Sequence, residues 1–282
     1  MRSNEPKLAT HRLYSNDTQR EISSPQASGL DSRQPGRPAV IVRESSLRTN
    51  PNWEDRGNLD NSAAFSALGR RPRLLDLFSG AGGAAVGYHR AGFEVVGVDI
   101  KPQPRFPFEF HQADALTFPL DGFDAIHASP PCQAHSVMKN ATGVAHADLI
   151  PPTRELLASF NGPTVIENTE FAPLRDSLKL CGTMFGVRVR RHRLFEVRPS
   201  LAVLLPPCCC HNGVIRGELI GHRQGGRVAM GRTKPPHHTP SEARAAIGVE
   251  WMTTTEARQA IPPAYTEYIG AALMRAILER AA

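Results

Sequence analysis

The stretch Leu74-Leu75-Asp76-Leu77-Phe78-Ser79-Gly80-Ala81-Gly82-Gly83 decides the fold of this chain. Leu74 to Phe78 is a short apolar run that predicts a buried strand, and Ser79 to Gly83 is a glycine-rich turn. The residues from Ala84 to Ala91 predict a helix, which Gly92 ends. The stretch therefore predicts a strand, a tight turn and a helix in immediate succession, as in a βαβ unit.

The second strand of this unit completes a nucleotide-binding pattern. Val95 to Val98 is another apolar run, and it closes on Asp99, about 20 residues after the turn. In such a unit the glycines let the backbone approach a ligand, and the acid accepts hydrogen bonds from ribose hydroxyls. We expect Gly80, Gly82 and Asp99 to bind an adenosine-bearing cofactor. A dinucleotide or a flavin fits equally well at this point, because Gly80-x-Gly82-x-x-Ala85 also satisfies that fingerprint.

Length, composition and charge narrow the class of protein. The chain has 282 residues, 40% of them apolar, which is enough for one large α/β domain with attachments. The net charge is +6 with arginine in excess, which favours a nucleic-acid partner, although a GC-rich genome also enriches arginine. The five cysteines, three of them adjacent, suit a reducing cytoplasm rather than a disulfide framework. No apolar stretch approaches the roughly 18 residues that span a bilayer, and residues 1–50 contain no signal-peptide core.

A second motif, Ser129-Pro130-Pro131-Cys132-Gln133, follows another apolar run, Phe123 to His127. Open α/β sheets carry their chemistry on loops at the carboxyl ends of strands. Two successive prolines hold this loop extended, so that Cys132 is presented in one direction. Taken alone, the loop fits a buried cysteine beside a turn equally well.

Acidic and basic side chains follow the later strands. Asp114 comes after a predicted third strand, where it could meet an adenine amino group, and Thr164 to Asn168 is a predicted strand that carries Glu167. Arg191 and Arg193 are two residues apart, so an extended backbone would put both on one face. The structural alternatives are strand-end caps for the acids and a solvated basic face for the arginines.

With these pieces in order, the chain resembles the DNA (cytosine-5-)-methyltransferase family. The matching motifs, in the family's order, are DLFSGAGG (76–83), GVDI (97–100), SPPCQAHS (129–136), ENT (167–169) and RHRLF (191–195). The resemblance covers residues 73–197 well and returns more weakly over 239–278. His135, Thr169 and Val189 stand where members usually carry phenylalanine, valine and glutamine, which indicates a divergent member.

The resemblance implies a Rossmann-like α/β fold and methyl transfer from S-adenosylmethionine to carbon 5 of cytosine in DNA. Carbon 5 is a poor nucleophile until a thiolate adds to carbon 6, and Cys132 resembles the family's nucleophile. Enzymes that methylate exocyclic amino groups have a similar loop with Tyr or Phe in place of this cysteine. Glu167 resembles the residue that protonates nitrogen 3, and Arg193, with Arg191, would steady the flipped base or a phosphate.

The predicted cofactor site combines the glycine turn, the ends of two strands and the proline loop. Its residues are Phe78, Gly80, Gly82, Asp99, Asp114 and Pro130. Core packing is the alternative role for Phe78. A zinc site made of Cys208, Cys210, His211 and a remote ligand is conceivable, but no second pair has ligand spacing, so we predict no metal.

We expect four parts in the chain. Residues 1–70 are predicted to be a disordered leader, with 39–42 as the one strand-like run. Residues 71–197 are the predicted catalytic and cofactor-binding core, and 198–238 a small target-recognition segment with a glycine-rich basic loop for phosphates. Residues 239–282 are predicted to be helices that complete the core, the first of them begun by a Thr-Pro-Ser-Glu capping box.

The expected partner is double-stranded DNA with a flipped base, bound by a monomer in the cytoplasm of a bacterial or phage-infected cell, in DNA methylation of the restriction-modification type. Three alternatives stay open. The same chemistry could act on cytosine in RNA or in a nucleotide, because the recognition segment is short. The chain could be a catalytically silent protein that binds the cofactor and DNA. It could also be a dinucleotide-dependent oxidoreductase.

Overall fold

The computed structural model describes residues 68–135, 146–187, 189–200, 203–208, 215–216 and 239–281. All of them belong to one compact unit, which spans 38–282. The predicted strand at 39–42, nearly all of the predicted leader and most of the predicted recognition segment lie outside the described residues, so the four-part division stays a prediction.

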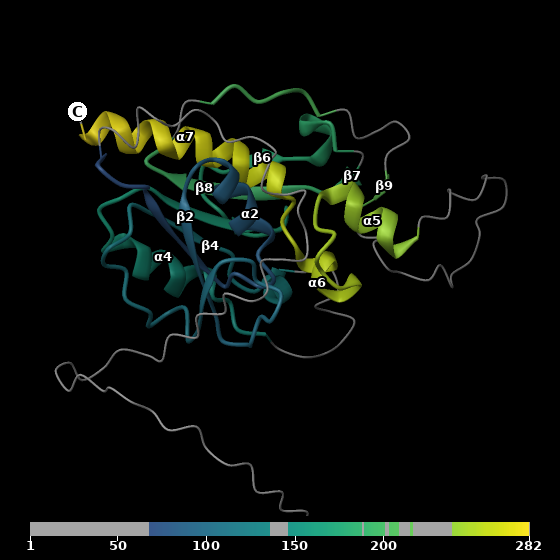
Figure 1. Cartoon of the computed structure of the whole chain (residues 1–282), viewed down its shortest axis with the longest axis horizontal. Helices are drawn as coiled ribbons and strands as arrows, with labels where there is room; N and C mark the ends of the chain where they lie inside the picture. Colours follow the sequence, from purple (N-terminus) through teal and green to yellow (C-terminus); the bar gives the residue numbers. More distant parts are fainter. Residues whose placement is uncertain are drawn as a thin grey trace, which may run out of the picture. The chain divides into compact units, whose positions relative to one another are not determined.

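A seven-stranded sheet forms the centre of the fold, in the order β3-β2-β1-β4-β5-β8-β6 (Figure 1). The strands are β1 (Arg73–Leu77), β2 (Glu94–Asp99), β3 (Glu109–Gln112), β4 (Ala125–Ala128), β5 (Thr164–Asn168), β6 (Leu178–Leu180) and β8 (Arg193–Arg198). The pairs from β3 to β5 are parallel, whereas β8 is antiparallel to both of its neighbours. The structure therefore confirms the predicted Rossmann-like α/β sheet.

The strand order reverses at β1, which pairs with β2 on one side and with β4 on the other. In open α/β sheets, the carboxyl ends of the strands at such a reversal form the crevice where ligands bind. The loops that leave β1 and β4 are the glycine turn and the proline loop. The topology therefore brings together two motifs that are about 50 residues apart in the sequence.

The predicted βαβ unit is confirmed by β1, α2 (Gly83–Arg90) and β2. Leu74, Leu75 and Leu77 are fully buried because both faces of β1 are covered. Gly82 precedes α2 with φ of 86°, a backbone conformation that favours glycine. The glycine-rich stretch thus turns the chain directly from the strand into the helix.

Two layers of helix cover the two faces of the sheet. Helix α2 packs closely on α7 (Pro263–Ala281), and both contribute to a core that includes Leu74 and Phe195 (Figure 1). Helix α4 (Ile150–Ala158) contributes Leu157 to a second core with Leu75. Neighbouring residues of β1 therefore enter different cores, as strand alternation requires.

Two short helices close the structure beside the glycine turn. They are α5 (Pro240–Ile247) and α6 (Thr254–Gln259), each begun by a reciprocal threonine–glutamate capping box. The first of these boxes was predicted. Trp251, between the two helices, donates a hydrogen bond of 3.0 Å to the carbonyl of Ala81. The C-terminal region therefore contacts the glycine turn directly.

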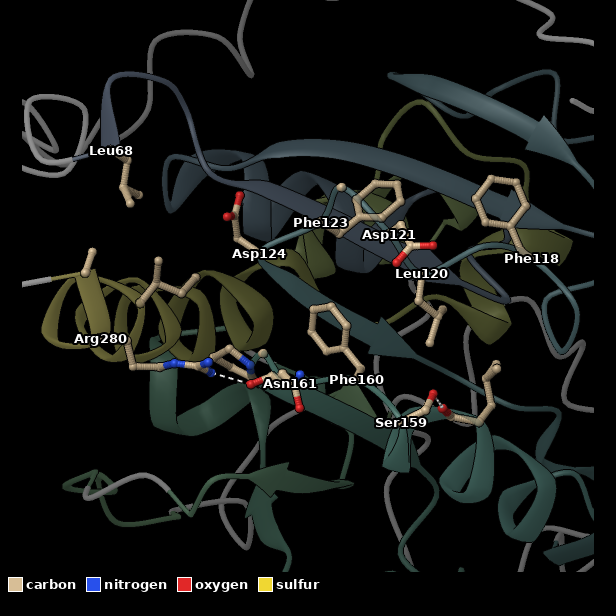
Figure 2. Close-up of a pocket in the computed structure, with 16 residues that line it drawn as sticks. Leu68, Phe118, Leu120, Asp121, Phe123, Asp124, Ser159, Phe160, Asn161 and Arg280 are labelled. Carbon is tan, nitrogen blue, oxygen red and sulfur yellow. Dashed lines mark hydrogen bonds between the residues drawn. The ribbon is translucent and has the colours of Figure 1, made fainter. Parts of the chain in front are cut away.

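A hollow lies at the opposite edge of the sheet from the predicted site. It has a volume of about 730 Å³, and its lining includes Asp124 and Pro163, which directly precede β4 and β5. Figure 2 shows the rings of Phe123 and Phe160 on its wall, with Arg280 of α7 nearby. Because the predicted chemistry follows the carboxyl ends of these strands, this hollow is separate from it.

Among the described residues, no helix is both long and apolar enough to cross a lipid bilayer.

The contact between α2 and α7 leaves no room for a side chain at position 87. A Cβ atom on Gly87 would lie 2.0 Å from Thr266 Oγ1 and 2.2 Å from the carbonyl oxygen of Pro263. We expect Gly87→Ala to lower the free energy of unfolding, measured by urea denaturation, by about 1–3 kcal/mol or more. Arg275→Ala, at an exposed position of α7, is the control and should change it by less than about 0.5 kcal/mol. Equal stability of Gly87→Ala and wild type would contradict this account of the packing.

Candidate active site

The proline loop is fastened to the end of β5. The Nδ2 atom of Asn168 donates a buried hydrogen bond of 2.8 Å to the carbonyl of Pro130. The amide of Ser129 donates to the carbonyl of Leu77 at 3.1 Å, which ties the start of the same loop to β1. Cys132 begins a short 3-10 turn, Cys132–His135, and is partly exposed. The predicted nucleophile therefore lies on a loop held by both neighbouring strands.

Glu167 is buried on β5, directly before the asparagine that holds this loop. Burial raises the pKa of its carboxyl, while the charge of Arg193, a hydrogen bond from Ser129 and the charge of Arg191 act in the opposite direction. The Oε1 atom lies 3.1 Å from Arg193 Nε, but the two groups are not aligned for a hydrogen bond. One carboxyl oxygen therefore keeps a free hydrogen-bonding position while its charge is partly balanced.

A chain of buried polar groups connects Glu167 to helix α2. Ser129, which hydrogen-bonds to Glu167, lies 2.8 Å from His127 Nε2 through its Oγ atom. The Nδ1 atom of His127 lies 2.9 Å from the hydroxyl of Tyr88. Burial lowers the pKa of His127 to about 3, so its ring is neutral and offers one donor and one acceptor to these two hydroxyls. Each side chain in the chain is therefore held by a hydrogen bond to the next.

The two arginines occupy different environments. Arg193 is the first residue of β8, whereas Arg191 precedes it in the irregular link after β7 (Val189–Arg190), so the expected single strand face does not extend to both. The Arg191 guanidinium is buried and donates to the carbonyl of Arg258, and Tyr265 donates to the Arg191 carbonyl at 2.6 Å. Arg193 therefore pairs directly with Glu167, while Arg191 is anchored to the C-terminal helices.

The charge of Arg191 still acts on the predicted catalytic groups. Burial, and next the charge of Arg193, lower the pKa of Arg191 to about 9, while Tyr265, Glu167 and Cys132 act to raise it. Glu167 and Cys132 are therefore both among the groups that act electrostatically on this one guanidinium.

The glycine turn and the end of β2 form one connected unit. The amide of Gly80 donates to Asp99 Oδ2 at 3.0 Å, and the amide of Lys101 donates to Asp99 Oδ1 at 2.9 Å. Phe78, a non-glycine residue with φ of 57°, turns the chain out of β1 and packs on the α4 side of the sheet. A Cβ atom on Gly80 would meet nothing within 4 Å, so the space beside the turn is open.

Buried polar atoms beside this turn fit a polar ligand. Ser79 Oγ and both carboxyl oxygens of Asp76 are buried and have no hydrogen-bond partner within the described ranges. Ile100, next to Asp99, exposes 67% of its surface and offers an apolar contact that sequence analysis did not identify. Open backbone, unpaired acceptors and an exposed apolar side chain together suit a nucleoside with a charged tail.

Asp114 already makes a local hydrogen bond within its own loop. It is exposed after β3, and its Oδ1 atom accepts a hydrogen bond of 2.9 Å from the amide of Leu116. This contact is the capping alternative, and it leaves the other carboxyl oxygen for a ligand. Pro130 is buried and has no N–H group, and its carbonyl already accepts one hydrogen bond from Asn168, so this residue can offer a ligand its ring and the second lone pair of that carbonyl.

Sequence analysis did not identify the buried chain of Tyr88 and His127. The one available signal was a histidine within the otherwise apolar β4, which by itself fits a core histidine with a hydrogen-bond partner.

A family model matches part of the chain. A family model described as C-5 cytosine-specific DNA methylase matches residues 73–159. The match includes the glycine turn, Asp99 and Cys132, and ends before Glu167 and the arginines. No curated protein matches the sequence.

Many solved structures are similar to this one. They include the S. pombe Dnmt2 methyltransferase, 17% identical over 45% of this chain and 49% of that chain, with a TM-score of 0.34. The Entamoeba histolytica methyltransferase EhMeth is 12% identical over 73% of this chain and 99% of that chain, with a TM-score of 0.49. An RNA methyltransferase from Salinibacter ruber, in complex with S-adenosyl-L-homocysteine, is 15% identical over 53% and 99%, with a TM-score of 0.27. The chain thus spans about half of the first structure and nearly all of the other two.

Asp76 should give the protein a pH-dependent stability. Burial foremost, with the charges of Asp99 and Glu167, raises the pKa of Asp76 well above its usual value. A raised carboxyl pKa stabilises the fold fully below the unfolded value, near about 4, and this stabilisation is lost as the pH rises through the folded value. Relative to Asp76→Asn, we expect wild type to lose up to about 1.4 kcal/mol per pH unit above pH of about 4, measured by urea unfolding at several pH values. Parallel pH profiles of the two proteins would show that Asp76 ionises normally in the fold.

Proposed function

We propose that this protein transfers a methyl group from S-adenosylmethionine to carbon 5 of cytosine in DNA, through a covalent adduct with Cys132. One observation carries the proposal. The cysteine loop and a buried carboxyl of raised pKa are fastened together at the carboxyl edge of the sheet, through the bond between Asn168 and Pro130 and that between Ser129 and Glu167. The methylase family model, which matches this loop, supports cytosine as the base.

The cofactor is assigned to the glycine turn. Asp99 would accept from the ribose hydroxyls, the backbone at Gly80 would lie against the ligand, and Phe78 with Ile100 would contact the adenine ring. The unpaired oxygens of Ser79 and Asp76 would face the methionine part. When bound, S-adenosylmethionine supplies a methyl group on a positively charged sulfur.

The cytosine ring is activated by two groups of this chain. The Cys132 thiolate adds to carbon 6, and Glu167 donates a proton to nitrogen 3, which makes carbon 5 nucleophilic. After carbon 5 has taken the methyl group, its proton passes to water, the Cys132 thiolate departs, and the nitrogen 3 proton returns to the Glu167 carboxylate, which restores the aromatic ring. Because burial keeps Glu167 partly protonated at higher pH than an exposed carboxyl, it can act as the acid in this step.

The buried polar chain would position this acid. Ser129 uses its hydroxyl to hold one oxygen of Glu167, and His127 holds Ser129 in turn, which leaves Oε1 for the base. Arg193 would limit the charge left on the carboxylate after proton donation. A base stacked within a duplex cannot reach this loop, so the substrate nucleotide must be flipped out of the helix.

Covalent capture tests the reaction. The purified chain is mixed with S-adenosylmethionine and a pool of random-sequence DNA duplexes in which every cytosine is 5-fluorocytosine. Fluorine at carbon 5 blocks the final elimination, so we expect an adduct that survives denaturing electrophoresis. Cys132→Ser should form none, and omission of the cofactor should prevent the stable methylated adduct.

The same experiment separates the alternatives. Capture on 5-fluorocytosine RNA but not on DNA would assign the chemistry to RNA. Absence of any adduct, with S-adenosylhomocysteine bound in calorimetry, would indicate a silent binding protein and overturn the proposal. Tighter binding of NAD or FAD than of S-adenosylhomocysteine would indicate an oxidoreductase instead.

Glu167→Gln should remove the acid without removing the cofactor site. We expect the turnover number to fall by about 10²- to 10⁴-fold, with calorimetric binding of S-adenosylhomocysteine unchanged. In wild type the rate should decline as the pH rises through the raised pKa of Glu167, and the variant should lack this decline. Glu155→Gln, at an exposed position of α4, is the control and should match wild type. Full activity of Glu167→Gln would exclude this carboxyl as the proton donor.

A further inference from the structure

Three side chains of types that can bind a metal ion come from separate parts of the chain and meet at the end of the sheet that carries Arg193. Cys181 directly follows β6 and is buried, His192 directly precedes β8, and Cys208 is exposed on the chain that has left β8. One ligand atom from each of them lies within 4.8 Å of the other two. The Nε2 atom of His192 is 3.9 Å from the Sγ atom of Cys208. Two thiols and an imidazole thus converge on one point.

The groups around these three side chains orient them toward that point. His192 Nδ1 lies 2.9 Å from Glu170 Oε2, so a metal bound at Nε2 would leave the Nδ1–H group to donate to this carboxylate. The Oγ1 atom of Thr183 lies 3.5 Å from Cys181 Sγ and 3.6 Å from Cys208 Sγ. A carboxylate behind a histidine and a hydroxyl beside the sulfurs are the outer contacts that metal ligands usually have.

The chemistry of the ligands favours zinc. Thiolate and imidazole together are typical of tetrahedral Zn²⁺ sites, whereas Mg²⁺ and Ca²⁺ take oxygen ligands. In a tetrahedron with bonds of about 2.0–2.3 Å, neighbouring ligand atoms lie roughly 3.5–3.8 Å apart. The observed spacings, up to 4.8 Å, would therefore contract by at most about 1.3 Å on binding.

We propose that Cys181, His192 and Cys208 supply three of the four ligands of a tetrahedral zinc site. It departs from our prediction of no metal, and it differs from the zinc site considered around Cys208, whose other members, Cys210 and His211, lie outside the described residues. The ligands here are 11 and 16 positions apart, which no short spacing motif would reveal. The proposal concerns metal binding and stands independently of the methyl-transfer reaction.

The site would connect two functional parts of the molecule. His192 lies between Arg191 and Arg193, and Arg193 Nη1 donates to the His192 carbonyl at 2.8 Å. A metal on His192 therefore fixes the backbone from which Arg193 reaches Glu167. Because Cys208 lies in residues 198–238, the same ion would hold the beginning of the predicted recognition segment against the catalytic core.

Metal content tests the site directly. The full chain, without a metal-binding tag, is purified and its zinc is measured by inductively coupled plasma mass spectrometry. We expect about one zinc per chain, close to zero in Cys208→Ser and in His192→Gln, and an unchanged content in Cys132→Ser, whose thiol is outside the cluster. Cobalt substitution of wild type should produce the sulfur-to-metal charge-transfer band and the intense visible bands of a tetrahedral thiolate site. Cys208→Ser and His192→Gln should lack these bands.

The outer carboxylate provides a finer test. Glu170→Gln should keep the zinc but bind it about 10- to 100-fold more weakly in competition with a chelator, whereas the exposed-position control Glu250→Gln should bind it as wild type does. Circular dichroism confirms that each variant is folded. Three results would each overturn the proposal. They are a wild-type chain that contains no zinc after incubation with zinc, zinc that is retained by Cys208→Ser, and a Cys181–Cys208 disulfide in anaerobically purified protein.

Discussion

The hydrogen bond from the Asn168 side chain to the Pro130 carbonyl holds the candidate site together. The loop after β4 contains two successive prolines, which have no N–H groups, so a strand ladder cannot fix it. A side-chain amide at the end of the neighbouring strand fixes it instead. Because Glu167 directly precedes Asn168, the residue that positions the cysteine loop is also bound covalently to the residue that carries the acid. The relative placement of thiol and carboxyl therefore depends on this buried contact together with the hydrogen bonds of Ser129 to Leu77 and Glu167.

Opposing electrostatic effects act on the acid in this arrangement. Burial favours the protonated form of Glu167, while two arginines and a serine hydroxyl favour the ionised form. The environment of Glu167 thus favours neither the neutral acid alone nor the ion pair alone. Hydrogen bonds inside a protein are electrostatically stronger than in water, so the chain through Ser129, His127 and Tyr88 can hold this balance in one geometry.

The sequence was informative where the determinants are local. The glycine-rich turn between Phe78 and Gly83 and the capping box at Thr239 each specify a short segment by their own residues, and both were predicted. The partners of His127 and the companions of Cys208 could not be predicted, because they come from distant parts of the chain and follow no fixed spacing. The expectation that Arg191 and Arg193 share one face of a strand was wrong for a related reason. Strand alternation assumes a continuous strand, but β7 ends at Arg190 and β8 begins only at Arg193.

The close packing of α2 on α7 has a consequence for how the molecule is made. Helix α2 is among the first elements in the described part of the chain, while α7 is the last, and Trp251 reaches back to the turn just before α2. During synthesis, the apolar face of α2 therefore remains in contact with water until the residues of α7 have left the ribosome. The nascent protein has to protect that face, or be protected by chaperones, until α7 packs on it.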